Sequence, residues 1–196
     1  MAHKKKLTTR KIVWTALMAA LTVIGSYIRI VMPISIGGST AFHLGNIFCA
    51  LSGILLGPWL GGFAAGMGSF LYDILFFPAY ADEAWITFLT KGAYGLVAGL
   101  IAWLGKKSWN VNQPHSYAKA LVATVAGALT YAALYLAKSY FYSGRLLKGL
   151  THEAAMLGMV AKIPATIFNA VIAIVFAPIL AVAIRKALEK NHLSLN

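Results

Sequence analysis

Apolar residues fill long, nearly continuous stretches of this 196-residue chain, and most charged residues lie between or beside them. An α-helix rises about 1.5 Å per residue, so about 20 apolar residues cross the hydrocarbon core of a membrane. The pattern therefore predicts an all-α integral membrane protein, a compact bundle of six transmembrane helices in a single domain over residues 1–196. The predicted spans are 12–32, 43–56, 59–77, 84–104, 118–142 and 163–187.

The second span is short, and only Gly57 and Pro58 separate it from the third. A Gly-Pro pair is a strong turn signal. We therefore predict that the second and third spans form a hairpin, which is either tilted or re-entrant.

Composition agrees with a membrane location. The chain is 60% hydrophobic and 11% charged, whereas a soluble domain is about half apolar and about a quarter charged. An unusually apolar soluble protein would not explain why apolar runs of about 20 residues recur. A formal net charge of +12 would suggest nucleic-acid binding in a soluble protein. Here much of the excess lies at the chain ends and in one loop, so no nucleic-acid partner is predicted.

Lysine and arginine near the span ends predict the orientation, because cytoplasmic loops are enriched in them. Basic residues precede the first span and follow the fourth and the sixth. With six spans all three clusters fall on one side, which predicts that both termini are cytoplasmic. Arg145 and Lys148, between the last two spans, fit less well. The clusters are Lys4, Lys5, Lys6, Arg10 and Lys11; Lys106 and Lys107; and Arg185, Lys186 and Lys190.

Catalytic and metal-binding signals are weak. The chain has a single cysteine, Cys49, and no GxxxxGK[ST] phosphate-binding loop. Ser69, within the sequence GMGSF, weakly resembles an intramembrane serine nucleophile, but no strong motif places a histidine opposite it. His43 has no second histidine or cysteine at helical spacing, so a bond to substrate is favoured over a metal. We predict that the chain is not an enzyme and holds no metal or cofactor.

Small residues recur four apart on several spans. In lipid, helix association depends on close packing rather than on the hydrophobic effect, and such pairs allow two backbones to approach. Four pairs indicate tight packing within one bundle. From spacing alone, Ala16 and Ala20 are predicted to pack internally rather than to form a strip for a partner subunit. The pairs are Ala16/Ala20, Gly53/Gly57, Gly62/Gly66 and Gly95/Gly99.

Ionisable residues also occur within or near the spans, where a central charge costs at least roughly 2.5–3.5 kcal/mol. The predicted topology places all of them in the outer half of the membrane. Snorkelling toward the headgroups is one explanation, and a buried Lys91–Asp73 pair is another. A shared cavity is favoured, because polar residues lie beside them. These residues are Arg29, Asp73, Lys91, Lys138 and Lys162.

Helical spacing brings further polar and aromatic residues to the same faces. Thr87, Lys91 and Tyr94 share one face, and Tyr131, Tyr135, Lys138 and Tyr142 share another. Lys162, Thr166 and Asn169 repeat the pattern. Stacking rings with a few convergent polar groups suit a small organic molecule. An outer tyrosine belt would explain Tyr142 but not the deeper Tyr131. The predicted substrate-binding residues are His43, Asn46, Asp73, Thr87, Lys91, Tyr94, Tyr135, Lys138, Lys162 and Asn169.

The order of motifs resembles a known family. ALMAALTVIGSYIRI is followed by PISIGGSTAF, HLGNIFCALSGILLGPWLGGFAAGMGSFLYDIL and WITFLTKGAYGLVAGLIA. This order is similar to that of the substrate-binding S components of energy-coupling factor (ECF) vitamin transporters, in the riboflavin-type or hydroxymethylpyrimidine-type branch. The resemblance covers nearly the whole chain and is strongest over residues 43–102.

The resemblance implies a six-helix protein of the bacterial cytoplasmic membrane that binds one vitamin or precursor near the outer face. It implies association with a transmembrane T component and two cytosolic ATPases, which would use the ATP and Mg. S components are thought to topple in the membrane to release substrate. In this family a small AxxxA strip on the first span contacts the T component, so the resemblance favours docking at Ala16 and Ala20. Residues 33–42 would form a lid, with Gly37 and Gly38 allowing its movement.

The resemblance leaves the substrate open. More cations than acids, together with several tyrosines, suit a flat heteroaromatic with hydroxyls, and pyridoxine or hydroxymethylpyrimidine is the best guess. Pantothenate and riboflavin are alternatives, and a thiamine-like cation fits less well. A self-sufficient carrier is the rival class, but such a carrier is expected to show internal repeats or paired broken helices.

Overall fold

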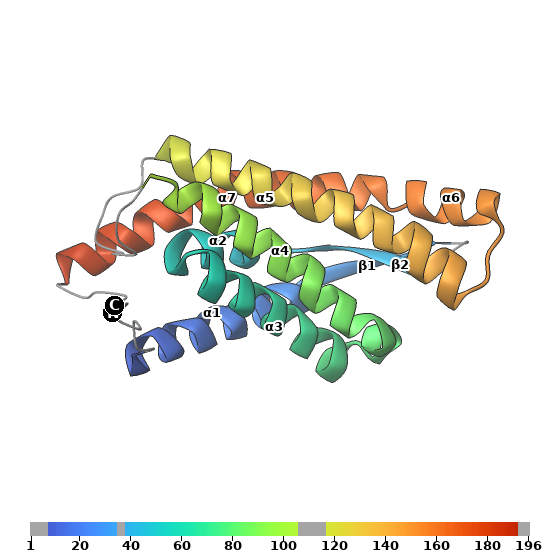
Figure 1. The fold of residues 1–196 in the computed structure, drawn as a ribbon, viewed down its shortest axis with the longest axis horizontal. Helices are drawn as coiled ribbons and strands as arrows, with labels where there is room; N and C mark the ends of the chain where they lie inside the picture. The colour runs from blue at the N-terminus through green and yellow to red at the C-terminus, as the bar shows by residue number, and fades with distance from the viewer. Residues whose placement is uncertain (1–7, 35–37, 106–116, 192–196) are drawn as a thin grey trace, which may run out of the picture.

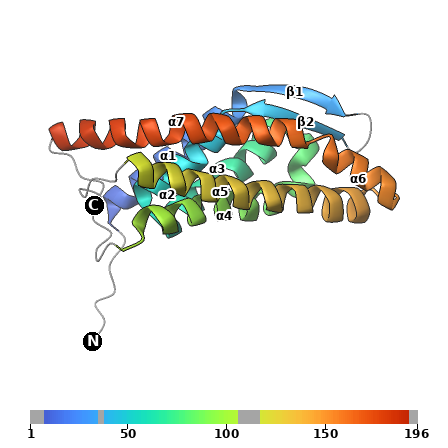
Figure 2. The ribbon, with the colours of Figure 1, turned by 90° about the horizontal axis from the view of Figure 1, so that it is seen from above.

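A computed structural model describes residues 8–34, 38–105 and 117–191. Its helices run roughly along one direction and form a bundle (Figure 1). The first described turn of α1 and the last turn of α7 lie at one end, and a two-stranded hairpin lies beside α7 toward the other (Figure 2). The elements are α1 (Thr9–Tyr27), β1 (Arg29–Ile34), β2 (Gly38–His43), α2 (Gly45–Leu56), α3 (Pro58–Phe76), η1 (Pro78–Glu83), α4 (Ala84–Trp103), α5 (Tyr117–Ala137), η2 (Lys138–Leu147), α6 (His152–Val160) and α7 (Ile163–Lys190).

The predicted six-helix bundle is confirmed when η1 is counted with α4, η2 with α5, and α6 with α7. Within the described ranges, four helical units are long and apolar enough to cross a membrane. They are Pro58–Phe76, Pro78–Trp103, Tyr117–Leu147 and His152–Lys190, and α2 is a shorter apolar helix.

The end of the first predicted span is wrong, and the described residues of the predicted lid belong to a β-hairpin. The helix stops at Tyr27, and residues 29–34 form β1, which pairs antiparallel with β2 so that Arg29 lies opposite His43. Two β-branched residues, Ile30 and Val31, favour a strand, and Pro33 is disfavoured inside a helix. Gly38 pairs with Ile34 within the hairpin. Gly37 lies outside the described residues, as do the basic residues at 4–6 and 106–107.

The last two spans also differ from prediction. Residues 138–147 continue α5 as a π-helix, and the predicted loop before the sixth span contains α6. Thr151 caps α6 by accepting the N–H of Ala154 at 3.3 Å, and acidic Glu153 lies in its first turn. These short-range signals explain a helix where apolar length alone predicted a loop.

Glycines set the closest contacts of the bundle, where α2, α3 and α4 meet. Gly57 joins α2 to α3 with φ 85°, a conformation that favours glycine, and Pro58 starts α3. A Cβ on Gly53 would overlap the backbone of Gly95, and a Cβ on Gly99 would lie 2.5 Å from the backbone of Pro58. The glycine strips therefore pack within the protein.

The C-terminal end of α2 is capped by side chains from two other helices. The Ile54 carbonyl accepts the indole N–H of Trp103 at 3.1 Å and a guanidinium N–H of Arg185 at 3.0 Å. A helix leaves its last carbonyls without intrahelical partners, so these bonds satisfy one of them. Arg185, one of the basic residues from which the orientation was predicted, is itself buried.

Candidate functional site

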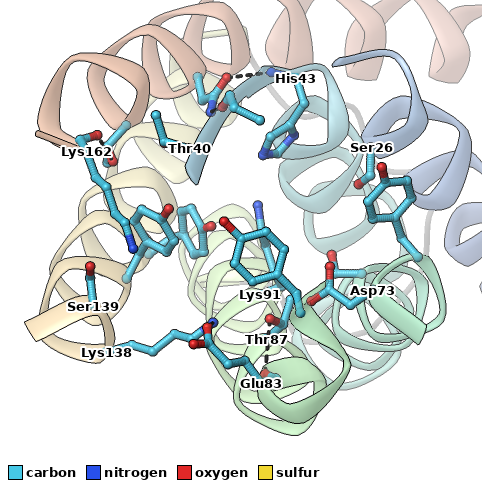
Figure 3. A pocket seen from close by; sticks show the side chains of 18 of the residues that line it. Ser26, Thr40, His43, Asp73, Glu83, Thr87, Lys91, Lys138, Ser139 and Lys162 are labelled. Carbon is cyan, nitrogen blue, oxygen red and sulfur yellow. Dashed lines mark hydrogen bonds and ion pairs between the residues drawn. The ribbon is translucent and has the colours of Figure 1, made fainter. Parts of the chain in front are cut away.

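A polar cavity lies inside the bundle, beneath β2 and between α3, α4, α5, η2 and α7. Figure 3 shows Lys91 near its centre, with Lys162, Ser139 and Lys138 along one wall. Ser26 and Asp73 lie along the opposite wall, and Thr40 and His43 reach in from the hairpin. Elements distant in sequence thus supply one set of polar groups.

The structure brings eight of the ten predicted substrate-binding residues to this cavity. The other two, Asn46 and Tyr94, are fully packed behind it, at 2% and 0% exposure. The eight are His43, Asp73, Thr87, Lys91, Tyr135, Lys138, Lys162 and Asn169.

Lys91 is held in place by the two residues behind it and by a tyrosine that the prediction left out. Its ammonium group donates to Asn46 Oδ1 and lies 3.9 Å from the centroid of the Tyr131 ring. Tyr131 stacks on Tyr94 and on Tyr135, with centroid distances of 5.8 and 5.6 Å. A cation over a tyrosine face is stabilised by the ring quadrupole. Asn46 and Tyr94 therefore position Lys91 and Tyr131 rather than facing the cavity.

The ion pair at the site differs from the one considered in the sequence. Within the described ranges no ion pair joins Lys91 to Asp73. Instead, Lys138 pairs with Glu83 at 2.6 Å, and both side chains are nearly buried. Lys138 was predicted to belong to the site, whereas the apolar pattern left Glu83 in the loop before the fourth span. The turn η1 folds Glu83 back over the cavity (Figure 3).

Asn169 lines the cavity but uses its amide to hold the hairpin. Its Oδ1 accepts the backbone N–H of His43 at 2.9 Å, and its Nδ2 donates to the Ala41 carbonyl at 2.8 Å. From another side, the Tyr80 hydroxyl donates to the Ser39 carbonyl at 2.7 Å. The hairpin is thus fixed over the cavity by side chains from α7 and η1.

His43 is a neutral group with a defined tautomer. Burial, reinforced by the charges of Lys91 and Arg29, lowers the pKa of His43 well below its ordinary value. Its Nδ1 accepts the backbone N–H of Gly45 at 3.1 Å. The ring proton therefore resides on Nε2, which makes His43 a hydrogen-bond donor at that atom.

Arg29 was noted in the sequence as a charge near the membrane but not as part of the site. It lines the cavity from β1, donates to the Tyr72 hydroxyl at 3.1 Å and stacks 4.3 Å from the Phe77 ring centroid. Its Nε is buried without a hydrogen-bond partner among the described residues. The strand that carries Arg29 was predicted as helix, which concealed the direction of its side chain.

Several lining residues were missed, and one series carried a usable signal. Tyr131, Tyr135, Ser139 and Ser143 follow each other at four-residue spacing and all line the cavity. The wider turn of the π-helix keeps such a series on one face beyond the end of α5. Ser69, which the sequence offered only as a weak nucleophile candidate, also lines the cavity. The other missed residues are Ser26, Thr40, Ala41, Tyr72, Tyr80 and Thr166.

Ala16 and Ala20 are exposed on α1, unlike the glycine strips. They line an apolar groove between α1 and α3, whose other walls include Leu60, Phe63 and Met67. This arrangement makes them available to another apolar surface. Among the described residues no group of three histidine, cysteine or acidic side chains could hold a metal ion.

Comparisons with known proteins give a family, a related sequence and a similar fold. The sequence model of the ECF-type riboflavin transporter S component matches residues 6–186. A protein of Pyrococcus woesei, described as an uncharacterized protein in gap 3'region, is 33% identical over 125 residues, which cover 64% of this chain and 74% of the relative. The crystal structure of an S component for biotin from an ECF-type ABC transporter has a similar fold. Its TM-score is 0.61 at 15% identity, over 94% of this chain and 95% of that chain.

Proposed function

The chain belongs to the family of ECF-type riboflavin transporter S components, and we propose that it captures a compact, ring-containing vitamin or vitamin precursor for ATP-driven uptake. The substrate-binding role for a vitamin and the multi-pass membrane location follow from the family and the apolar helices. The family is a transporter component rather than a catalytic enzyme. A location in the cytoplasmic membrane of a bacterium agrees with this family.

The cavity beneath the hairpin is the observation that carries the substrate proposal. It combines stacked tyrosines with a central lysine, and Asp73 can accept hydrogen bonds from ligand hydroxyls. The cavity volume that the centres of water molecules can reach is about 90 Å³. A cavity needs roughly 10–15 Å³ of this volume to hold one water molecule. This size favours a compact molecule. Pyridoxine or hydroxymethylpyrimidine remains the best guess, and pantothenate and riboflavin remain alternatives.

The proposed orientation places the cavity toward the outside and both termini in the cytoplasm. Two features support it. The described ends of α1 and α7 lie together, at the end of the bundle away from the hairpin (Figure 2). Basic residues also gather near both chain ends in the sequence, as cytoplasmic segments do.

S components of this family work with a T component and ATPases, and we propose that the groove at Ala16 and Ala20 receives the T component. Exposed small residues line this groove beside apolar side chains, so the backbone of a second membrane helix can approach α1 closely. The chain itself would need no cofactor. ATP and Mg would be used by two cytosolic ATPases.

Reconstitution tests this function. Purified chain in liposomes should retain a labelled vitamin but should accumulate it only when the T component, the ATPases and ATP are added. Mass spectrometry of small molecules released from the purified chain would identify the ligand. Accumulation by the chain alone under an ion gradient would establish the rival function, a self-sufficient carrier, and overturn the proposal.

A further inference from the structure

The cavity carries more positive than negative charge. Its charged lining residues are Arg29, Lys91, Lys138, Lys162, Asp73 and Glu83. Glu83 and Lys138 neutralise each other at 2.6 Å. Three cations then face one remaining carboxylate, that of Asp73. An uncompensated charge that is removed from water raises the free energy of the protein. A ligand of opposite charge would therefore be attracted by all the charged residues of the cavity together.

Lys162 is the cation with the least internal compensation. It is only 5% exposed, yet its ammonium group has no hydrogen bond or ion pair within the described part of the chain. Its recorded neighbour is the Tyr135 ring, with a centroid 5.8 Å away. Glu83 lies within electrostatic reach but is already bound to Lys138. Three ammonium donors at the cavity wall are therefore available to a ligand.

The polar groups around Lys162 suit an oxyanion. Ser139 lies on the same wall, with Lys138 beyond it, while Asp73 lies across the cavity (Figure 3). Hydroxyl and ammonium donors recognise carboxylate and phosphate oxygens through charge-assisted hydrogen bonds. The Asp73 carboxylate instead suits a hydroxyl or N–H donor of the ligand.

We propose that the substrate is an anion, with its carboxylate or phosphate group bound by Lys162 and Ser139 and its ring beside Tyr131 and Tyr135. A donor group of the substrate then faces Asp73. This inference rests on the proposed function and, among its candidates, favours a compound with one acidic group over the neutral pyridoxine, hydroxymethylpyrimidine and riboflavin.

Matched compounds test the proposal by titration calorimetry on the full chain in detergent. Pyridoxine, 4-pyridoxate and pyridoxine 5′-phosphate share a ring and differ in having no acid, a carboxylate or a phosphate. Pantothenate and pantothenol form a second pair that differs by a carboxylate. We expect the acid to bind about tenfold or more tightly than its neutral counterpart, the gain typical of hydrogen bonds to a charged group. The preferred acid distinguishes a carboxylate site from a phosphate site.

Lys162→Gln should remove most of this preference. Lys148→Gln is the matched control, because Lys148 is an exposed lysine whose charge acts on Lys162 without lining the cavity. It should keep the preference. Equal or tighter binding of the neutral compound, or a preference that survives in Lys162→Gln, would overturn the inference.

If none of the five compounds binds, the molecule that co-purifies with the chain decides the question. An anion supports the inference and a neutral or cationic molecule overturns it. A neutral ligand taken up with the complete transporter would leave the proposed function intact. Failure of the complete transporter to take up any vitamin would overturn the proposed function itself.

Discussion

Asn169 on α7 accepts the backbone N–H of His43 on β2 at 2.9 Å. The same amide donates to the Ala41 carbonyl, two residues earlier on that strand. Alternate residues present their backbone groups on one strand edge, so Asn169 takes the place that a further strand would occupy. One side chain thereby closes the hairpin onto the bundle.

We expect Asn169→Ala to loosen the hairpin. Two hydrogen bonds worth about 0.5–1.5 kcal/mol each would be lost, so the open hairpin should become roughly tenfold more populated or more. Hydrogen-exchange mass spectrometry of a peptide covering 38–43 should show faster exchange, and bound substrate should dissociate faster. Asn191→Ala is the control, because that amide bonds only the Ala187 carbonyl at the exposed end of α7. Equal rates of amide hydrogen exchange in the Asn169 variant and the wild type would contradict the proposal that Asn169 holds the hairpin.

Lys91→Ala should weaken substrate binding by about tenfold or more while the chain still inserts and folds. Lys91 is 4% exposed and lies near the centre of the cavity, so its ammonium group is well placed to contact a ligand. Titration of the ligand identified by mass spectrometry provides the measurement, with size-exclusion chromatography as the check on folding. Lys190→Ala, at the exposed end of α7, should bind normally. An unchanged affinity in Lys91→Ala would refute its role.

Gly53→Ala should destabilise the bundle, by about 1–3 kcal/mol or more, because its Cβ would overlap the Gly95 backbone, which cannot rotate away. Gly92→Ala is the matched control. Its Cβ would meet the Gly62 carbonyl at 3.4 Å, an ordinary contact, so the stability should change little. Melting temperatures in detergent would compare the two. Similar values for both variants would show that the α2–α4 contact is looser than described.

Ala16→Trp and Ala20→Trp should each abolish transport without affecting substrate binding. An indole would fill the groove between α1 and α3, which lies away from the polar cavity. Uptake by the complete transporter and titration of the isolated chain measure the two effects separately. Val122→Trp, on the exposed face of α5, controls for the added bulk. Normal uptake in the alanine variants would place the T component elsewhere.

The helical parts of the fold were predictable because they depend on the apolar length of each segment. The same argument failed at residues 29–34, where apolar residues continue but the backbone pairs with β2. Hydropathy alone does not distinguish an apolar strand from a helix segment. Pro33 and the neighbouring β-branched residues were the local signals, and they were outweighed by the long apolar run.

Side chains of the site were predictable where a regular helix carries them, as with Lys91 and Tyr135. Glu83 and Arg29 were placed less well, because a 3₁₀ turn and a strand set their directions. Asn169 was correctly brought to the cavity, but its polar atoms bond to the hairpin. Sequence spacing predicts the helix face on which an amide side chain lies. It does not predict which backbone groups that amide will bond.

The backbone contacts among α2, α3 and α4 begin beside Lys91, where a Cβ on Gly66 would meet the Phe88 carbonyl, and continue to Gly99 and Pro58. Because backbone meets backbone at these points, side-chain rotation cannot separate the three helices, and we expect them to move as one rigid unit. A bound molecule can leave more cheaply by the opening through which it arrived. On the proposed orientation, that opening would reach the far side of the membrane only if the whole chain turned over. ATP hydrolysis in the partner subunits would then drive the rotation of a rigid body rather than the opening of a passage through it.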